Sequence, residues 1–385
     1  MNKNKITNLK LTVFTFLFII FLSNAFVDFL IYQKNPSSKF FLQKPNYKKK
    51  TEIIENSNEK IYPNIGSIIN NPSLSLILEK KNTIFFGDIA NSKIVLCNEI
   101  GEFVYFKSDK YGFRNFDKDY NKNKSLMVGD SFGMGVCIKD EHYLKNLKLK
   151  VRNLSVAGSG PLEQIALINE YVNYFDVDNL IWLFYEGNDI LDFREELKNP
   201  ILKKYDDLNY SNWPNYEYFS NKGKIDEILI QYTENLLKKD INKTSHFYKI
   251  QNGKEFSLSR IFKLTATRNI LRNIRDNFSY ESSYVIEKYL ENLKKINDLL
   301  LSKDIKVNMV FLPSYSTIKN QKIKKTTLDL KELIKIKFKN INLINFDEHL
   351  LKKNFDSTDV FITKKTHYNN NIYLELYEYI NNQVF

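Results

Sequence analysis

Short apolar runs alternate with segments of helical period along the second half of the chain. The pattern predicts strands at 125–129, 150–156, 179–185, 306–312 and 340–346, and helices at about 141–148, 161–175, 281–303, 327–338 and 370–382. The helix at 281–303 is the clearest, because its apolar residues recur close to every three or four positions. Strands that alternate with helices form a parallel sheet covered on both faces, so the pattern predicts an α/β fold.

The rest of the chain follows this pattern less closely. Three short β-like runs occupy 83–86, 93–96 and 102–106. Residues 33–80 are polar and weakly periodic, which predicts a linker or a loosely packed extension. Residues 192–280 are polar and rich in aromatics, with weak helical stretches, and are expected to form a helical and loop insertion. The expected α/β domain therefore covers 81–385, with the insertion at about 192–280.

The N-terminus has the pattern of a membrane or export segment. An uncharged apolar run at 11–27 follows three lysines, and a spanning helix needs about 20 such residues. We expect a signal-anchor, or transmembrane helix, over 1–32. Ser23-Asn24-Ala25 resembles a small-residue cleavage site, so a cleavable signal peptide stays open. The expected location is an inner-membrane anchor with the main domain in the periplasm, or secretion if the segment is cleaved.

Charge and cysteine content exclude some functions. The chain has 385 residues and a formal net charge of +12, but its lysines are scattered and no Arg-rich helix or zinc-finger spacing occurs, so we expect no nucleic-acid partner. Cys97 and Cys137 lack the spacing of a redox or metal motif. A disulfide in an exported protein and two buried free thiols both remain open. No metal or other cofactor is expected.

Candidate catalytic residues fall at the ends of predicted strands. The strand at 125–129 leads into Gly129-Asp130-Ser131, a tight turn that displays a hydroxyl at the start of a helix. A serine held there acts as a nucleophile if a base reaches it. Glycines around Gly158 allow a substrate oxygen to approach the backbone, and Asn188 can donate its amide to a developing oxyanion. His367 lies in the loop before the final helix, where a base could reach Ser131.

The order of these motifs resembles the SGNH/GDSL hydrolase superfamily. Gly-Asp-Ser comes first, then the glycine turn, then Gly-Asn-Asp, then the late histidine. The Gly-Phe-Arg segment within 109–115 and the sequence Trp-Leu-Phe-Tyr-Glu-Gly-Asn-Asp at 182–189 resemble blocks of one bacterial envelope branch. The similarity covers about 109–190, and 281–382 by topology together with His367. It implies a three-layer α/β/α, flavodoxin-like parallel sheet.

The resemblance also implies roles for individual residues. Ser131 would be the nucleophile and His367 the base that takes its proton. The oxyanion would be bound by the backbone N–H groups of Ser131 and Gly158 and by the side chain of Asn188. Asp130, Asp189 and Arg114 are expected to serve turns, caps or ion pairs instead.

One position departs from the family pattern. The family usually has an aspartate three residues before the histidine to orient the imidazole, and this chain has Lys364 there. Asp356 or Asp359 could take that role if the loop folds back. Otherwise a backbone carbonyl would orient the ring in a Ser-His dyad, or the chain would be an inactive relative.

The leading hypothesis is an envelope serine esterase that acts through an acyl-serine intermediate. Its partners would be an ester substrate, such as an acylated polysaccharide or a lipid, and the membrane through the N-terminal helix. One alternative is an O-acyltransferase that modifies a cell-surface polysaccharide with the same residues. The other is a catalytically degenerate domain of this type that binds glycan.

Overall fold

The computed structural model describes residues 59–97, 99–100, 102–115, 124–139, 151–242, 283–362 and 366–385, with Tyr143, Ile54 and six residues between 15 and 23. Contacts between Cα atoms divide the chain into two compact units. One comprises 1–45 and 239–282, and the other comprises 46–238 and 283–385. The second unit holds the sheets and all the candidate residues.

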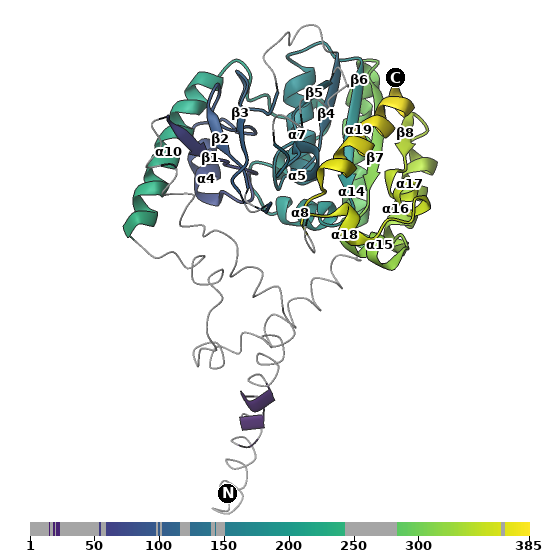
Figure 1. The fold of residues 1–385 in the computed structure, drawn as a ribbon. Helices are drawn as coiled ribbons and strands as arrows, with labels where there is room; N and C mark the ends of the chain where they lie inside the picture. The colour runs from purple at the N-terminus through teal and green to yellow at the C-terminus, as the bar shows by residue number, and fades with distance from the viewer. Residues whose placement is uncertain are drawn as a thin grey trace, which may run out of the picture. The chain divides into compact units, whose positions relative to one another are not determined.

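A five-stranded sheet forms the centre of this unit (Figure 1). Its order is β5-β4-β6-β7-β8, and every neighbouring pair is parallel. The strands are β4 (Ser125–Val128), β5 (Val151–Asn153), β6 (Asn179–Tyr185), β7 (Lys306–Leu312) and β8 (Ile341–Ile344). In chain order this is the 2-1-3-4-5 arrangement of flavodoxin-like folds. The predicted α/β class and parallel sheet are confirmed.

Helices cover both faces of the sheet, and the alternation along β6 shows how. Trp182 and Phe184 face one side, where Trp182 Nε1 donates to Gln164 at 2.5 Å and the Phe184 ring lies 5.8 Å from that of Tyr289. These partners belong to α7 (Pro161–Val172) and α14 (Ser283–Ser302). Ile181 and Leu183 face the other side and join a cluster with buried residues of α5 (Ser131–Met134), α17 (Phe346–Lys352) and α19 (Asn370–Val384). Both faces of β6 are therefore buried, as its unbroken apolar sequence requires.

The helices predicted at 161–175, 281–303, 327–338 and 370–382 are present with bounds shifted by a few residues, and short helices that the sequence did not predict lie between them. The helices are α5 (Ser131–Met134), α7 (Pro161–Val172), α14 (Ser283–Ser302), α15 (Tyr315–Asn320), α16 (Lys325–Lys337), α17 (Phe346–Lys352), α18 (Ser357–Val360) and α19 (Asn370–Val384). The helix expected at 141–148 lies outside the described residues except for Tyr143.

A second, smaller sheet precedes the large one. It contains β1 (Ile61–Pro63), β2 (Lys93–Val95) and β3 (Tyr105–Lys107), with β1 parallel and β3 antiparallel to β2. Helix α4 (Pro72–Lys80) buries Leu74 and Leu78. The described part of 33–80 thus forms packed structure where a linker or loose extension was expected, because a few apolar residues in a polar segment suffice to fix a short strand and helix.

The described part of the insertion is helical. It contains α8 (Asp189–Glu196), α9 (Lys203–Asp207), the 3₁₀ turn η1 (Tyr210–Asn212) and α10 (Lys222–Asn242). Buried Glu170 on α7 attaches the insertion to the large sheet's helices. Its carboxylate accepts hydrogen bonds from the backbone N–H groups of Tyr216 at 2.6 Å and Tyr218 at 3.0 Å. Residues 243–282 lie outside the described part.

Most of the expected signal-anchor at 1–32 also lies outside the described residues. Within the described ranges, no helix is both long and apolar enough to cross a membrane.

Arg114 joins the small sheet to the large one. This buried guanidinium donates to the carbonyls of Gly135 (2.6 Å) and Ile138, and its carbon lies 4.2 Å from the centre of the Tyr143 ring. Nearby, Asn115 pairs with the backbone of Asn153 on edge strand β5 through two hydrogen bonds of 2.9 Å. The Gly-Phe-Arg segment therefore supports the loop that follows Ser131.

Replacing Arg114 with methionine should destabilise the domain. Arg114→Met keeps an apolar stem of similar volume but leaves two buried carbonyls without this donor, which costs about 2–4 kcal/mol in the free energy of unfolding. Urea denaturation followed by circular dichroism measures it. Lys139→Met is the matched control, since its ion pair with Glu102 joins the same two parts of the fold but is exposed and contributes less than about 1 kcal/mol. Equal losses in both variants would contradict the role given to Arg114.

Candidate active site

Ser131 begins helix α5 at the carboxyl end of β4. Asp130 is the N-cap, and its carboxylate accepts the N–H of Phe132 at 2.8 Å. The helix ends at Gly135, whose φ of 66° is left-handed. A Cβ at Gly133 would come within 2.3 Å of Ser155 Oγ, so glycine lets the turn pack against the next loop. The half-buried Ser131 stands at the sheet edge where ligands of parallel α/β folds bind.

His367 reaches the same edge from the loop before α19. Its carbonyl accepts the N–H of Ile362 at 2.9 Å. The next residue, Tyr368, is fully buried and donates its hydroxyl to the carbonyl of Pro313 at 2.7 Å. The imidazole centre lies 5.2 Å from that of the Phe132 ring. The structure therefore brings His367 beside the residue that follows Ser131.

Glu99 contacts His367 at two points. Its Oε2 lies 3.1 Å from the ring Nδ1 and 3.4 Å from the backbone nitrogen of His367. The two side chains are 18% and 22% exposed, so the contact is largely shielded from solvent. No spacing motif in the sequence links these residues, and only the fold brings this carboxylate to the ring.

Ser131 Oγ and the His367 ring make no direct hydrogen bond among the described residues. Catalytic hydrogen bonds are often long in a structure without substrate and tighten when it binds. Proton transfer between them would therefore need the two side chains to move together when substrate binds.

The turn at Gly158 follows strand β5, which is the neighbour of β4 in the sheet. Gly158 has a φ of +79°, and a Cβ there would come within 2.6 Å of Asn70 Nδ2, so both the conformation and the space require glycine. In the described ranges, no protein acceptor takes the backbone N–H of Ser131 or Gly158. Two donors with these properties are what an oxyanion hole needs.

Asn188 is in a different state from the one expected. Its Nδ2 donates to Asp192 Oδ2 at 2.7 Å. Its Oδ1 is buried without a partner. In this structure the amide is therefore directed at a carboxylate, and binding an oxyanion would require it to turn from Asp192.

Buried carboxyl groups gather next to this amide, and their pKa values are raised. Burial raises the pKa of Asp130 to about 6, against the opposing hydrogen bond from the N–H of Phe132 and the charge of His367. Burial and the charge of Asp130 raise the pKa of Asp192 to about 7. Burial likewise raises the pKa of Glu196 to about 8, although its oxygens accept the N–H groups of Gly160 and Leu162. Glu196 and, in part, Asp192 are therefore protonated near neutral pH, whereas Asp130 is protonated only in mild acid.

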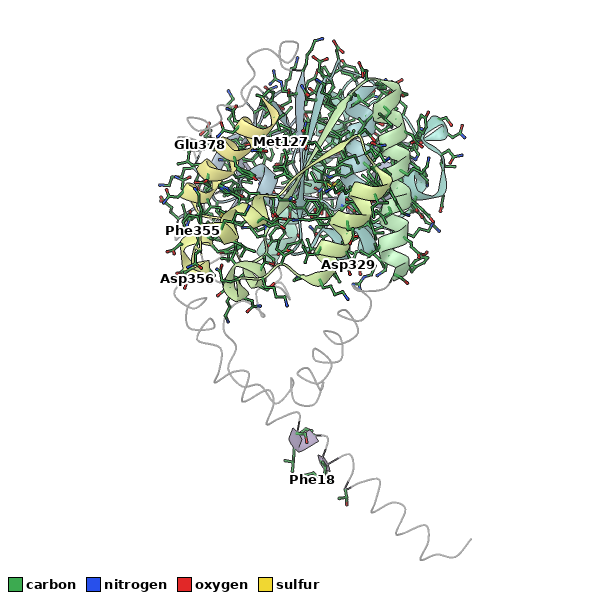
Figure 2. The ribbon with its side chains drawn as sticks, turned by 90° about the vertical axis from the view of Figure 1, so that its right-hand side faces the viewer. Phe18, Met127, Asp329, Phe355, Asp356 and Glu378 are labelled. Atoms are coloured by element: carbon green, nitrogen blue, oxygen red, sulfur yellow. A yellow bond between two sulfur atoms is a disulfide. The ribbon has the colours of Figure 1, made fainter. Side chains whose placement is uncertain are left out.

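The two aspartates considered as orienting acids lie elsewhere. Asp356 caps α18, and Asp359 completes the same capping box by accepting the backbone N–H of Asp356. Figure 2 shows Asp356 at the surface of the domain, whereas Met127 of β4 lies inside. Lys364, at the position of the family's usual acid, is outside the described residues. His349, another histidine near the C-terminus, contacts Glu375 at 2.6 Å through Nε2.

Cys97 and Cys137 form a disulfide. Glu99, Cys137 and His367 are the one cluster within the described ranges with metal-ligand spacing. Because Cys137 is bonded to Cys97, its sulfur offers no thiolate, and two ligands do not make a zinc site. We therefore interpret Glu99 and the disulfide as neighbours of the His367 ring and not as ligands of a metal ion.

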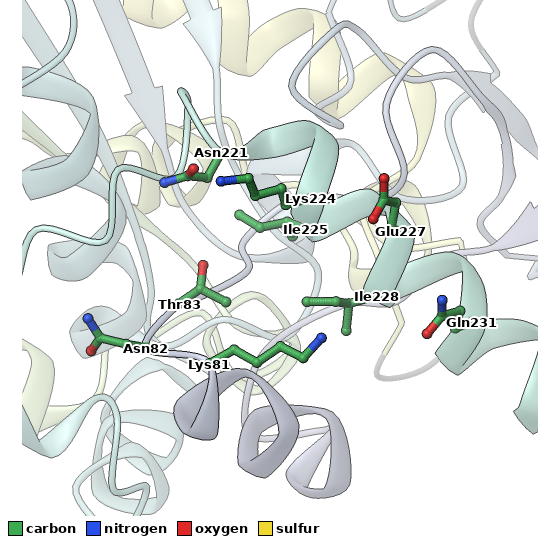
Figure 3. Close-up of a pocket in the computed structure, with 9 residues that line it drawn as sticks. All are labelled: Lys81, Asn82, Thr83, Asn221, Lys224, Ile225, Glu227, Ile228 and Gln231. Carbon is green, nitrogen blue, oxygen red and sulfur yellow. The ribbon is translucent and has the colours of Figure 1, made fainter.

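Two cavities stand out on this unit. One of about 400 Å³ adjoins the disulfide and is lined by apolar Ile100, Ile138, Phe361 and Ile362, with Lys139 and two asparagines. The other, of about 450 Å³, lies between the loop at 81–83 and α10 (Figure 3). Lysine, asparagine and isoleucine side chains line the second cavity, and none of the candidate catalytic residues does.

No protein-family model matches the chain, and no curated protein matches it either.

The carboxyl cluster predicts a pH dependence of stability. The pKa of Asp192, near 3.8 in the unfolded chain, rises to about 7 in the folded protein. Between about pH 4 and 7 the folded state keeps a proton that the unfolded state has lost, so the free energy of unfolding falls as the pH rises. Asp192→Asn keeps an acceptor for Asn188 and removes this titration. Its stability should decline less steeply, as measured by urea denaturation from pH 4.5 to 8.

The control is Asp298→Asn, which changes a carboxylate whose partner on the helix surface is Lys294. Its profile should run parallel to that of the wild type. A parallel profile for Asp192→Asn as well would rule out Asp192 as a source of the slope.

Proposed function

We propose that the protein is a serine esterase of the SGNH/GDSL type that cleaves ester-linked acyl groups through an acyl-serine intermediate. One observation carries the proposal. The turn that displays Ser131 at the end of β4 also places Phe132 against His367, and the Glu99 carboxylate contacts Nδ1 of that imidazole. Serine, histidine and an acid that approach from three separate segments are the components of a catalytic triad.

The chemistry starts with proton transfer from Ser131. With Nδ1 held by Glu99, the free Nε2 of His367 accepts the Ser131 proton as Oγ attacks the ester carbonyl carbon. The resulting tetrahedral oxyanion collapses, and His367 returns the proton to the departing alcohol. Water then attacks the acyl-serine with His367 again as base, and the carboxylic acid leaves. The cycle needs no cofactor.

The oxyanion is bound by the N–H groups of Ser131 and Gly158. Both lack a protein acceptor in the described ranges, which supports this role. Asn188 supplies a third donor when its amide turns from Asp192, and protonation of Asp192 weakens the bond that holds it there. Loss of one such donor typically lowers turnover about 10²- to 10³-fold.

The proposed location is outside the cytoplasm. Disulfides persist in oxidising compartments and are rare in the cytosol, which supports export of the unit that holds Cys97 and Cys137. The apolar run at 11–27 supplies an export signal or a membrane anchor. Esters at the cell envelope, in acylated polysaccharide or lipid, are the corresponding substrates.

The nucleophile can be tested without knowing the substrate. A fluorophosphonate probe should label the full chain, and Ser131→Ala should lose the label together with p-nitrophenyl acetate turnover, because no other group forms the acyl-enzyme. The expected loss of turnover is at least about 10³-fold. Labelling is read by intact-mass spectrometry.

Ser316→Ala is the matched control. This half-buried serine also follows a sheet strand at the start of a helix, and its removal should leave labelling unchanged. Equal labelling of the wild type and Ser131→Ala would contradict the proposal and favour a degenerate, glycan-binding domain. Acyl transfer to an added oligosaccharide in place of hydrolysis would favour the O-acyltransferase.

A further inference from the structure

Glu99 reaches His367 from the tip of the hairpin between β2 and β3. Leu96 N donates to Val104 O at 2.8 Å and Val104 N to Cys97 O at 2.8 Å, so the strands stay paired as far as Cys97. Glu99 stands two residues beyond this last pair. Its contact with His367 joins positions 268 residues apart in the sequence.

One covalent link holds this tip against the catalytic edge. Cys97 is bonded to Cys137, 40 residues away, in the loop that follows α5, with 5.5 Å between the two Cα atoms. Arg114 stabilises the same loop, because its buried guanidinium donates hydrogen bonds to the carbonyls of Gly135 and Ile138. The described tip is also linked to this loop by the exposed ion pair between Glu102 and Lys139, which is weak because water screens it.

We propose that Glu99 is the positioning residue of His367 and that the Cys97–Cys137 disulfide keeps it there, so that the site is fully assembled only in the oxidised protein. The inference rests on the proposed function for its catalytic meaning. Glu99 accepts a hydrogen bond from Nδ1–H and thereby fixes the tautomer whose lone pair lies on Nε2. It fills the role that the family pattern gives to the acid at the position of Lys364.

Reduction provides the switch. Two molecules of a thiol reductant give up two electrons and two protons to the disulfide. The sulfur–sulfur bond breaks, Cys97 and Cys137 become thiols, and the reductant leaves as its own disulfide. The hairpin tip is then no longer bonded to the loop that follows α5. The exposed ion pair between Glu102 and Lys139 is too weak to keep Glu99 in place, so its carboxylate moves away from Nδ1.

The first test replaces the acid in the oxidised full chain. Glu99→Gln should lower kcat for p-nitrophenyl acetate on the order of 10²- to 10⁴-fold with little change in KM, because the base is misoriented while the binding surface remains. Glu99→Asp should recover part of the loss. Glu102→Gln, which changes a carboxylate three residues away that pairs with Lys139, should keep the wild-type kcat.

The second test asks whether the disulfide acts through Glu99. Treatment with a phosphine or dithiol reductant should lower the wild-type kcat on the order of 10²-fold, and reoxidation should restore it. The Glu99→Gln variant, already without the acid, should lose less than about twofold on reduction. Circular dichroism before and after reduction shows whether the fold persists, and Cys97→Ser with Cys137→Ser should reproduce the reduced state.

A spectroscopic readout separates this inference from the proposed function. Nitrogen-15 shifts of the His367 ring report its tautomer: the oxidised wild type should carry the proton on Nδ1, and both Glu99→Gln and the reduced protein should shift it toward Nε2. Failure of Ser131→Ala to change turnover would end the esterase proposal while leaving this readout intact. An unchanged tautomer in Glu99→Gln, or equal loss on reduction with and without Glu99, would overturn the inference.

Discussion

The loop at 134–138 is the point on which the arrangement of the site depends. It follows the helix of Ser131 directly and is held from the small sheet in two ways, by the Arg114 guanidinium on its carbonyls and by the disulfide at Cys137. A buried carbonyl without a donor is costly, so the arginine fixes the path of the loop. The disulfide then fixes the hairpin that carries Glu99. Ser131 and the carboxylate beside His367 are thereby held by one short segment.

Several carboxyl groups are buried around the site, and burying an ionised carboxylate is unfavourable. Asp130, Asp192 and Glu196 are buried close to one another, and burial raises the pKa of each. Each carboxyl also has a structural task, since Asp130 caps α5 and Glu196 accepts the N–H groups that open α7. These groups are retained at some cost in stability because their hydrogen bonds shape the turns around Ser131. The amide of Asn188 donates to Asp192, so the protonation of that carboxyl affects the donor that an oxyanion would need.

The sequence predicted the larger elements well and the site in part. Strands β6 and β7 have the predicted bounds, because unbroken apolar runs ended by Pro313 or by Gly-Asn-Asp allow few alternatives. The positions of Ser131, Gly158 and His367 at one sheet edge followed from strand order. The small sheet was harder to foresee in full, since β1 is three residues long and lies in a polar segment. Local composition carries little information about so short a strand.

The sequence alone determined the α/β alternation, the turn that displays Ser131 and the need for glycine around it, because these depend on local periodicity and backbone conformation. Only the tertiary structure decided which acid meets His367. Asp356 and Asp359, near in sequence, are used to cap α18, whereas Glu99 arrives from 268 residues away. The pairing of Cys97 with Cys137 was decided in the same way. Contacts between distant segments depend on how whole sheets pack, and neither residue spacing nor local propensity encodes that packing.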